Sequence, residues 1–174
     1  MAKLSAGILL YKREGDKVSV MLVHPGGPFW AKKDDGAWSV PKGEIDPDED
    51  LLTAARREFA EETGSEVPEG DLLDLGEVKI STGKVIHVWA MEHDFDITTL
   101  KSNTFEMAWP PKSGQMQTFP EVDKAAWFAI AEAPIKMHTG QAIFIERLAE
   151  KLGVGLIAAE DGGAAVKPHQ TSLF

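Results

Sequence analysis

Three glutamates in one short segment have the residue type and the spacing of a metal site. Glu58, Glu61 and Glu62 stand at relative positions i, i+3 and i+4, so on an α-helix their carboxylates share one face. Like charges placed so closely destabilise a helix unless a cation lies among them. Carboxylate oxygens suit Mg²⁺ or Mn²⁺, hard ions that also assist phosphate chemistry. The alternative interpretation of the same residues is a solvated acidic helix face.

The residues around these glutamates complete a longer pattern. Gly43 is followed after five residues by Glu49 and after seven more by Arg57, where the run Arg57-Glu58-Phe59-Ala60-Glu61-Glu62-Thr63-Gly64 begins. This pattern resembles the signature of the Nudix hydrolases, G-x5-E-x7-R-E-U-x-E-E-x-G-U, in which U is a bulky apolar residue. Every fixed letter is present. The final U position holds Ser65, a departure that affects packing at the helix exit rather than the chemistry.

The resemblance implies an activity and a set of metal ligands. Nudix enzymes hydrolyse nucleoside diphosphates linked to another moiety, by metal-assisted attack of water on phosphorus. By resemblance, Glu58, Glu61 and Glu62 bind Mg²⁺ or Mn²⁺, and the backbone carbonyl of Lys42 is a candidate fourth ligand. Alternatively, Glu58 acts as the base, or as a carboxylate that contacts the metal ligands without binding the ion itself.

Charged residues beside the metal ligands have roles that the resemblance also implies. In the family, a pair such as Glu49 and Arg57 orients the metal-binding helix, and both are counted here with the catalytic residues. An exposed ion pair worth at most about 1 kcal/mol is the alternative. The Lys42 ammonium is a candidate contact for a substrate phosphate, and an ordinary solvated lysine is its alternative.

Glu121 is a further catalytic candidate outside this segment. It stands six residues before Trp127, which is similar to the Glu-x5-Trp arrangement of Nudix diadenosine tetraphosphate hydrolases. We therefore expect Glu121 to act as a further metal ligand or as the general base. A loop carboxylate without a role is the alternative.

The substrate class is predicted from the same resemblance. The run Trp38-Ser39-Val40-Pro41-Lys42-Gly43 is also similar to the diadenosine tetraphosphate hydrolases, so dinucleoside polyphosphates are the first expectation. ADP-ribose, nucleotide sugars and oxidised nucleoside triphosphates are alternatives within the same chemistry, and a non-catalytic nucleotide sensor is an alternative of another class. Trp109 is the candidate substrate-binding aromatic, and Trp30, Phe105 and Phe119 are further side chains able to stack on a base.

The distribution of apolar residues predicts an α/β domain that positions these groups. Strands are expected over 3–12, 18–24, 37–40, 72–80, 84–95 and 125–130, and helices over 50–63 and 138–152. Residues 100–120 are expected to form a long irregular loop. This order indicates an α/β fold, which the resemblance refines to a Nudix α/β/α sandwich around a mixed sheet. The domain is expected over 1–153, followed by a Gly/Ala-rich tail over 154–174.

Composition limits the classes of partner. The chain has 174 residues, no cysteine and a formal net charge of −10, so disulfides and thiolate zinc sites are excluded. A net negative charge disfavours nucleic acid polymers and anionic membranes as binding partners. No apolar run is long enough to cross a membrane. We expect a cytoplasmic monomer or homodimer that acts on a small nucleotide.

Overall fold

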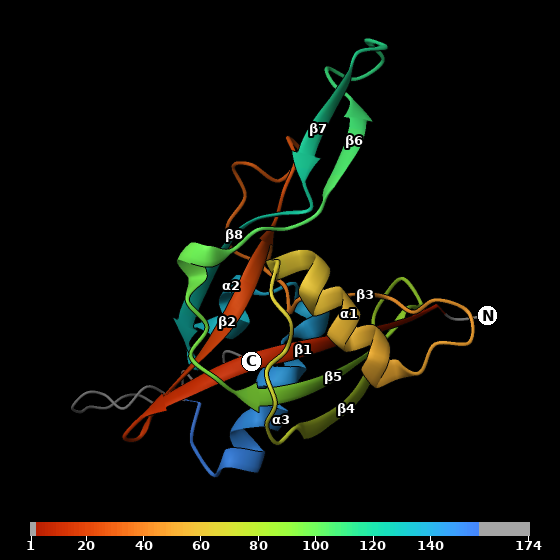
Figure 1. Ribbon diagram of the computed structural model, residues 1–174. Coiled ribbons are helices and arrows are strands. Elements are labelled where there is room, and N and C mark those ends of the chain that lie inside the picture. Colours follow the sequence, from red (N-terminus) through yellow and green to blue (C-terminus); the bar gives the residue numbers. More distant parts are fainter. Residues whose placement is uncertain (1–2, 157–174) are drawn as a thin grey trace.

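The structure is a computed structural model that describes residues 3–156. Its body is a six-stranded mixed sheet between helices, and a separate two-stranded hairpin projects from it (Figure 1). The strand order is β4-β5-β1-β2-β8, with β3 paired to β1. β1 runs parallel to β5, and the other pairs of this sheet are antiparallel. The strands of this sheet are β1 (Leu4–Glu14), β2 (Lys17–Pro25), β3 (Lys42–Glu44), β4 (Leu73–Lys79), β5 (Val85–Glu92) and β8 (Val122–Ala129).

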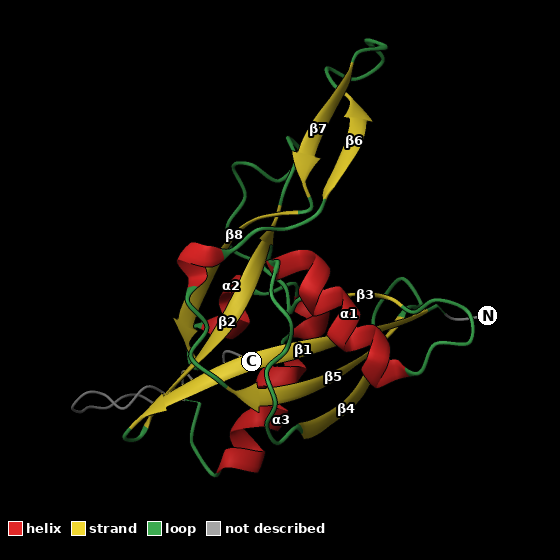
Figure 2. Ribbon diagram, in the orientation of Figure 1, coloured by secondary structure: helices red, strands yellow, loops and turns green. Residues whose placement is uncertain are grey.

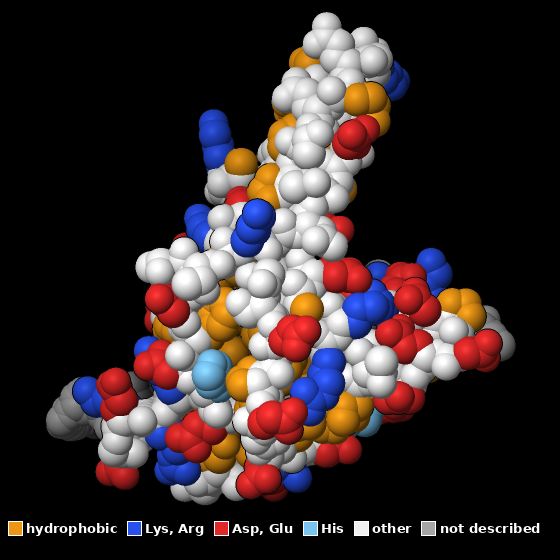
Figure 3. All heavy atoms as spheres, viewed as in Figure 1, with side chains coloured by type: hydrophobic (Ala, Val, Ile, Leu, Met, Phe, Trp, Pro, Cys, Tyr) orange, Lys and Arg blue, Asp and Glu red, His pale blue; other side chains and the backbone are white. Residues whose placement is uncertain are grey.

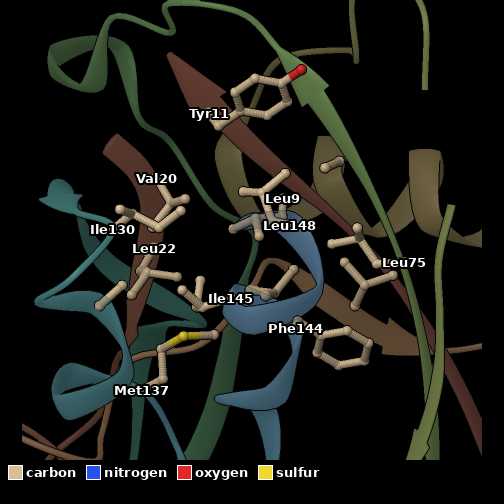
Figure 4. Close-up of a cluster of buried hydrophobic side chains, with 14 of the residues drawn as sticks. Leu9, Tyr11, Val20, Leu22, Leu75, Ile130, Met137, Phe144, Ile145 and Leu148 are labelled. Atoms are coloured by element: carbon tan, nitrogen blue, oxygen red, sulfur yellow. The ribbon is translucent and has the colours of Figure 1, made fainter. Parts of the chain in front are cut away.

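Alternation along β1 divides the core into two layers. Leu9 and Tyr11 pack into the cluster that includes Phe144 and Leu148 of α3 (Ile143–Leu152), as Figure 4 shows. Their neighbours on β1 point to the opposite face because successive side chains of a strand alternate. They pack with Phe59 of α1 (Leu51–Thr63). One helix on each face makes the predicted α/β/α sandwich, and the fold prediction is confirmed.

Both ends of α1 have local sequence causes. Asp50 is the N-cap, and its side chain accepts a hydrogen bond of 3.0 Å from the Thr53 N–H. Gly64 ends the helix at φ 81°, a left-handed conformation that glycine adopts without a Cβ penalty. The prediction of a helix over 50–63 is therefore confirmed to within one residue.

The prediction of an irregular loop over 100–120 is wrong. These residues include the hairpin of β6 (Thr104–Ala108) and β7 (Met116–Pro120), which Figure 2 shows projecting from the body. A short 3₁₀ turn, η1 (Ile97–Thr99), precedes it. Every side chain of the two strands is exposed or half-buried. The run Thr104-Phe105-Glu106-Met107 alternates polar and apolar residues, but it covers only four positions and the alternation does not continue in β7.

Two other expected boundaries also differ from the structure. Residues 37–40 form only isolated bridges through Trp38 and Ser39, and the regular strand is β3. The expected helix over 138–152 is a 3₁₀ turn, η2 (Thr139–Gln141), followed by α3, because the His138 side chain accepts from the Gly140 N–H and caps the short turn. A four-residue helix, α2 (Ala133–Lys136), precedes that turn.

The predicted tail lies mostly outside the described residues. Only 154–156 are described, and there Val154 and Leu156 pack against the α3 side of the core. The division at residue 153 stays a prediction. No helix within 3–156 is long and apolar enough to cross the hydrocarbon core of a membrane.

Candidate active site

Arg57 ties the loop after β3 to α1. Its Nε donates to Glu49 Oε2 at 2.9 Å and its Nη2 donates to Glu49 Oε1 at 3.0 Å. Nη2 also donates to the Glu44 carbonyl at 3.1 Å. The Glu49 side chain is only 12% exposed, so this two-point pair is not the solvated surface pair considered as the alternative. Arg–carboxylate pairs of this type fix orientation as well as distance.

The same guanidinium also contacts two of the predicted metal ligands. Nη1 of Arg57 donates to Glu58 Oε2 at 2.9 Å and to Glu61 Oε2 at 3.0 Å. The hydrogen bonds that Arg57 donates to Glu49 are the main reason that the pKa of Arg57 lies above its usual value. Arg57 therefore holds a loop carboxylate and two helix carboxylates around one permanent positive charge.

Gly43 leaves room for the Glu58 carboxyl group. A Cβ built at Gly43 would overlap all three atoms of that group, so the glycine of the motif is required by close approach. Burial raises the pKa of Glu58, and the Glu61 carboxylate raises it further. Glu58 is thus confined between the loop, Arg57 and its neighbouring glutamate.

Glu62 and Lys42 form the inner part of the site. The Lys42 backbone N–H donates to Glu62 Oε1 at 3.3 Å, which links β3 to α1. Burial raises the pKa of Glu62 to about 8 and lowers the pKa of Lys42. A carboxyl group in this position lacks the solvation that a charged form needs, and a bound cation would supply the missing stabilisation.

Glu121 is brought to the end of α1 by main-chain hydrogen bonds. The Asn103 N–H donates to the Glu61 carbonyl at 2.8 Å, and the Asn103 carbonyl accepts from the Glu121 N–H at 2.8 Å. On its other side, the Glu121 carbonyl accepts from the Gly26 N–H at 2.9 Å. Burial raises the pKa of Glu121, and Glu61 raises it further. The structure therefore brings Glu121 into the field of the helix carboxylates, whereas its catalytic role stays a prediction.

Ser102 supports Glu121, and the sequence contained no signal for it. Its Oγ accepts from the Val122 N–H at 3.1 Å and lies within donating distance of the Val122 carbonyl, at 3.0 Å. It can donate instead to the Asn103 carbonyl, at 2.8 Å. One hydroxyl therefore joins the irregular segment before β6 to the first residue of β8, immediately beside Glu121.

The donor set fits a hard divalent ion, although no preformed cage is present in the described part of the chain. Within 3–156, no three acidic or histidine side chains converge as a complete set of metal ligands. Glu58 and Glu61 each direct one oxygen at Arg57. Mg²⁺ normally needs only one or two protein carboxylates, because water and substrate phosphates complete its coordination. Glu62 and the free oxygens of Glu58 and Glu61 suit that role.

Trp109 does not lie beside these carboxylates. It follows the last residue of β6, six residues beyond Asn103, which is roughly 20 Å at 3.4 Å per residue of strand. Its ring meets Phe29 edge-on, with centroids 5.4 Å apart. Trp38 and Trp127 support the scaffold: the indole N–H of Trp38 donates to Asp34 at 2.8 Å, and that of Trp127 donates to the Phe95 carbonyl at 3.3 Å.

Comparison with known proteins identifies the family. A model of the NUDIX domain matches residues 1–148. The chain belongs to the Nudix family. An RNA pyrophosphohydrolase of Caulobacter vibrioides is 46% identical over 52 residues, which are 27% of this chain and 30% of that protein. The matched segment thus spans less than a third of the length of that relative.

Solved structures confirm the Nudix fold. A Caenorhabditis elegans Ap4A hydrolase in a binary complex superposes with a TM-score of 0.60 at 19% identity, covering 86% of this chain and 98% of that one. The NUDIX domain of Shewanella oneidensis NrtR with ADP ribose gives 0.59 at 20% identity, covering 87% and 89%. At this identity the likeness concerns the fold alone.

Proposed function

We propose that this Nudix protein hydrolyses a phosphoanhydride bond in a compound built on a nucleoside diphosphate. The observation that carries the proposal is the assembled motif: Glu58, Glu61 and Glu62 lie on one face of α1, which Arg57 ties to Glu49. A sensor that only binds nucleotides would not need this complete acidic set. A bound Mg²⁺ or Mn²⁺ would neutralise phosphate charge and acidify the attacking water.

The residues of the chain divide the remaining work. Glu58, Glu61 and Glu62 would hold the ion, and Arg57 orients two of these carboxylates through its hydrogen bonds. Glu121 is proposed to accept the proton of the attacking water on its carboxylate, since its main chain is tied to that of Glu61 through Asn103. The Lys42 ammonium, half-buried beside Glu62, is proposed to contact a substrate phosphate.

Dinucleoside polyphosphates are the proposed substrate class. The similarity of the Glu121-to-Trp127 spacing and of the run 38–43 to diadenosine tetraphosphate hydrolases supports this choice. The fold likeness to the worm Ap4A hydrolase is compatible with it. The 52-residue match to an RNA pyrophosphohydrolase favours a second candidate, the 5′-triphosphate end of RNA. The small-molecule preference, the cytoplasmic location and the monomeric or dimeric state stay predictions.

A substrate panel tests the proposal. Purified protein with Mg²⁺ would be given diadenosine tetraphosphate, ADP-ribose, a nucleotide sugar, normal and oxidised dGTP, and a 5′-triphosphorylated RNA oligonucleotide. Release of ATP and AMP from diadenosine tetraphosphate, faster than turnover of the other compounds, is the expected result. Glu61→Gln is the matched control, because it keeps the shape but removes one ligand charge. Turnover of none of these compounds, or equal turnover by Glu61→Gln, would overturn the assignment.

A further inference from the structure

Exposed aromatic side chains are concentrated beside the projecting hairpin. Phe29 is 58% exposed, Trp30 is 38% exposed and Met116, on β7, is 60% exposed. Together with Leu4 and Ile135 they are the large apolar side chains that residues 3–156 leave exposed. We call loop 26–36 and the β6–β7 hairpin the aromatic arm. Soluble proteins seldom gather such side chains in one place without a binding role.

Loop 26–36 follows the hairpin from its base toward its tip. At the base, Gly26 packs so closely against Pro120 that a Cβ there would overlap the Pro120 carbonyl. Further along, a Cβ on Gly27 would lie 3.0 Å from the ring of Phe105. At the far end, the rings of Phe29 and Trp109 meet. The loop and the hairpin therefore form one continuous surface that begins next to Glu121.

The C-terminal part of loop 26–36 is fixed by partly buried hydrogen bonds. His24 is fully buried; its Nε2 lies 2.7 Å from the Lys33 carbonyl and its Nδ1 lies 2.9 Å from Asp123 Oδ1. Asp34 accepts from the indole N–H of Trp38 at 2.8 Å. The aromatic side chains are thus carried by a loop anchored at both ends.

The aromatic arm is formally neutral, whereas the whole protein has a net charge of −10: Lys32, Lys33 and Lys112 are matched in number by Asp34, Asp35 and Glu106. The three lysines are exposed, and Lys33 Nζ lies 5.1 Å from the centroid of the Trp30 ring. The acidic side chains of loop 26–36, Asp34 and Asp35, both pair with Lys136. Figure 3 shows acidic and basic side chains intermixed on the body below the hairpin, whereas the hairpin carries mostly hydrophobic and uncharged groups and only a few charged ones. The exposed lysines can contact phosphates and the exposed rings can stack on a base, so the aromatic arm fits a ligand that has both groups.

We propose that the aromatic arm binds the distal nucleoside of a dinucleoside polyphosphate by stacking it on Trp109 and Phe29. This inference rests on the proposed function and extends it to a site away from the carboxylates. The extended chain between Asn103, which contacts α1, and Trp109 is roughly 20 Å long. The base of the nucleoside joined to the attacked phosphorus cannot reach Trp109. The base at the other end of the substrate, several phosphates away from that phosphorus, can reach it. A formally neutral arm does not suit a long polyanion, whereas its lysines can contact a few phosphates.

The test compares two substrates that differ only in the distal nucleoside. Diadenosine tetraphosphate and adenosine 5′-tetraphosphate are given to the wild type, Trp109→Ala, Phe29→Ala and the restoring variant Trp109→Phe. Loss of one stacked ring raises KM for diadenosine tetraphosphate about tenfold, with kcat unchanged. KM for adenosine tetraphosphate stays at the wild-type value, and Trp109→Phe recovers most of the loss. Ile135→Ala, which removes an exposed apolar side chain on α2, is the control.

Equal KM changes for the two substrates, or none for diadenosine tetraphosphate, would overturn the inference. Isothermal titration with diadenosine tetraphosphate in EDTA separates it from the proposed function, because binding is then measured without turnover. If the wild type hydrolyses no dinucleotide but Trp109→Ala and Phe29→Ala still bind it more weakly, the stacking site stands and the proposed activity fails. If both variants lose affinity for an RNA oligonucleotide and keep it for the dinucleotide, the occupant proposed here is wrong.

Discussion

Gly43→Ala should separate activity from stability. Ordinary contacts of a Cβ atom begin at 3.4 Å, and a Cβ at residue 43 would overlap the Glu58 carboxyl group. The carboxyl group must therefore move by roughly 1 Å, and a displacement of this size costs about 100-fold in rate. At 1.36 kcal/mol per tenfold, this is about 2.7 kcal/mol of transition-state stabilisation. The backbone at Gly43 is not left-handed, so the free energy of unfolding should fall little or rise by up to about 1 kcal/mol.

The assay is kcat/KM on the best substrate of the panel, with thermal melting in parallel. Gly155→Ala is the matched control, since a Cβ there meets open space at a backbone angle outside the left-handed region. Glu58→Asp shortens the side chain and removes the overlap, so Gly43→Ala should cause little further loss in that background. Wild-type activity in Gly43→Ala, or an equal loss in the Glu58→Asp background, would refute the steric argument.

Two further predictions concern the supports of the site. Ser102→Ala leaves the Val122 N–H without its hydroxyl partner. The value of kcat should fall about tenfold with KM unchanged, because Glu121 loses its position rather than its charge. Ser102→Thr should restore kcat. A proportional rise in KM, or no recovery with threonine, would contradict this role. Phe59→Ala removes a fully buried ring of α1, and urea denaturation should show a loss of about 3–5 kcal/mol in the free energy of unfolding. A loss no larger than that of Ile135→Ala would show that the α1 packing is misassigned.

The sequence by itself determined the helix that carries the carboxylates. Asp50 and Gly64 mark its ends, and the positions of Glu58, Glu61 and Glu62 place three carboxylates on one face, because helix periodicity is a local property. The partnership of Glu49 and Arg57 followed from the resemblance, and the structure contains the hydrogen bonds that it requires. Each cap, the glutamate spacing and the Glu49–Arg57 pair joins residues no more than 8 positions apart in the sequence.

Only the tertiary structure decided what surrounds that helix. Glu121 reaches α1 through Asn103 and the Ser102 hydroxyl, which are separated from Glu61 by about forty residues of chain, and no local pattern encodes such a contact. The β6–β7 hairpin escaped prediction because its strands pair with each other away from a core, so β7 shows no apolar alternation and β6 shows it over four residues only. Periodicity reports which side chains face a core, and the aromatic arm does not face one.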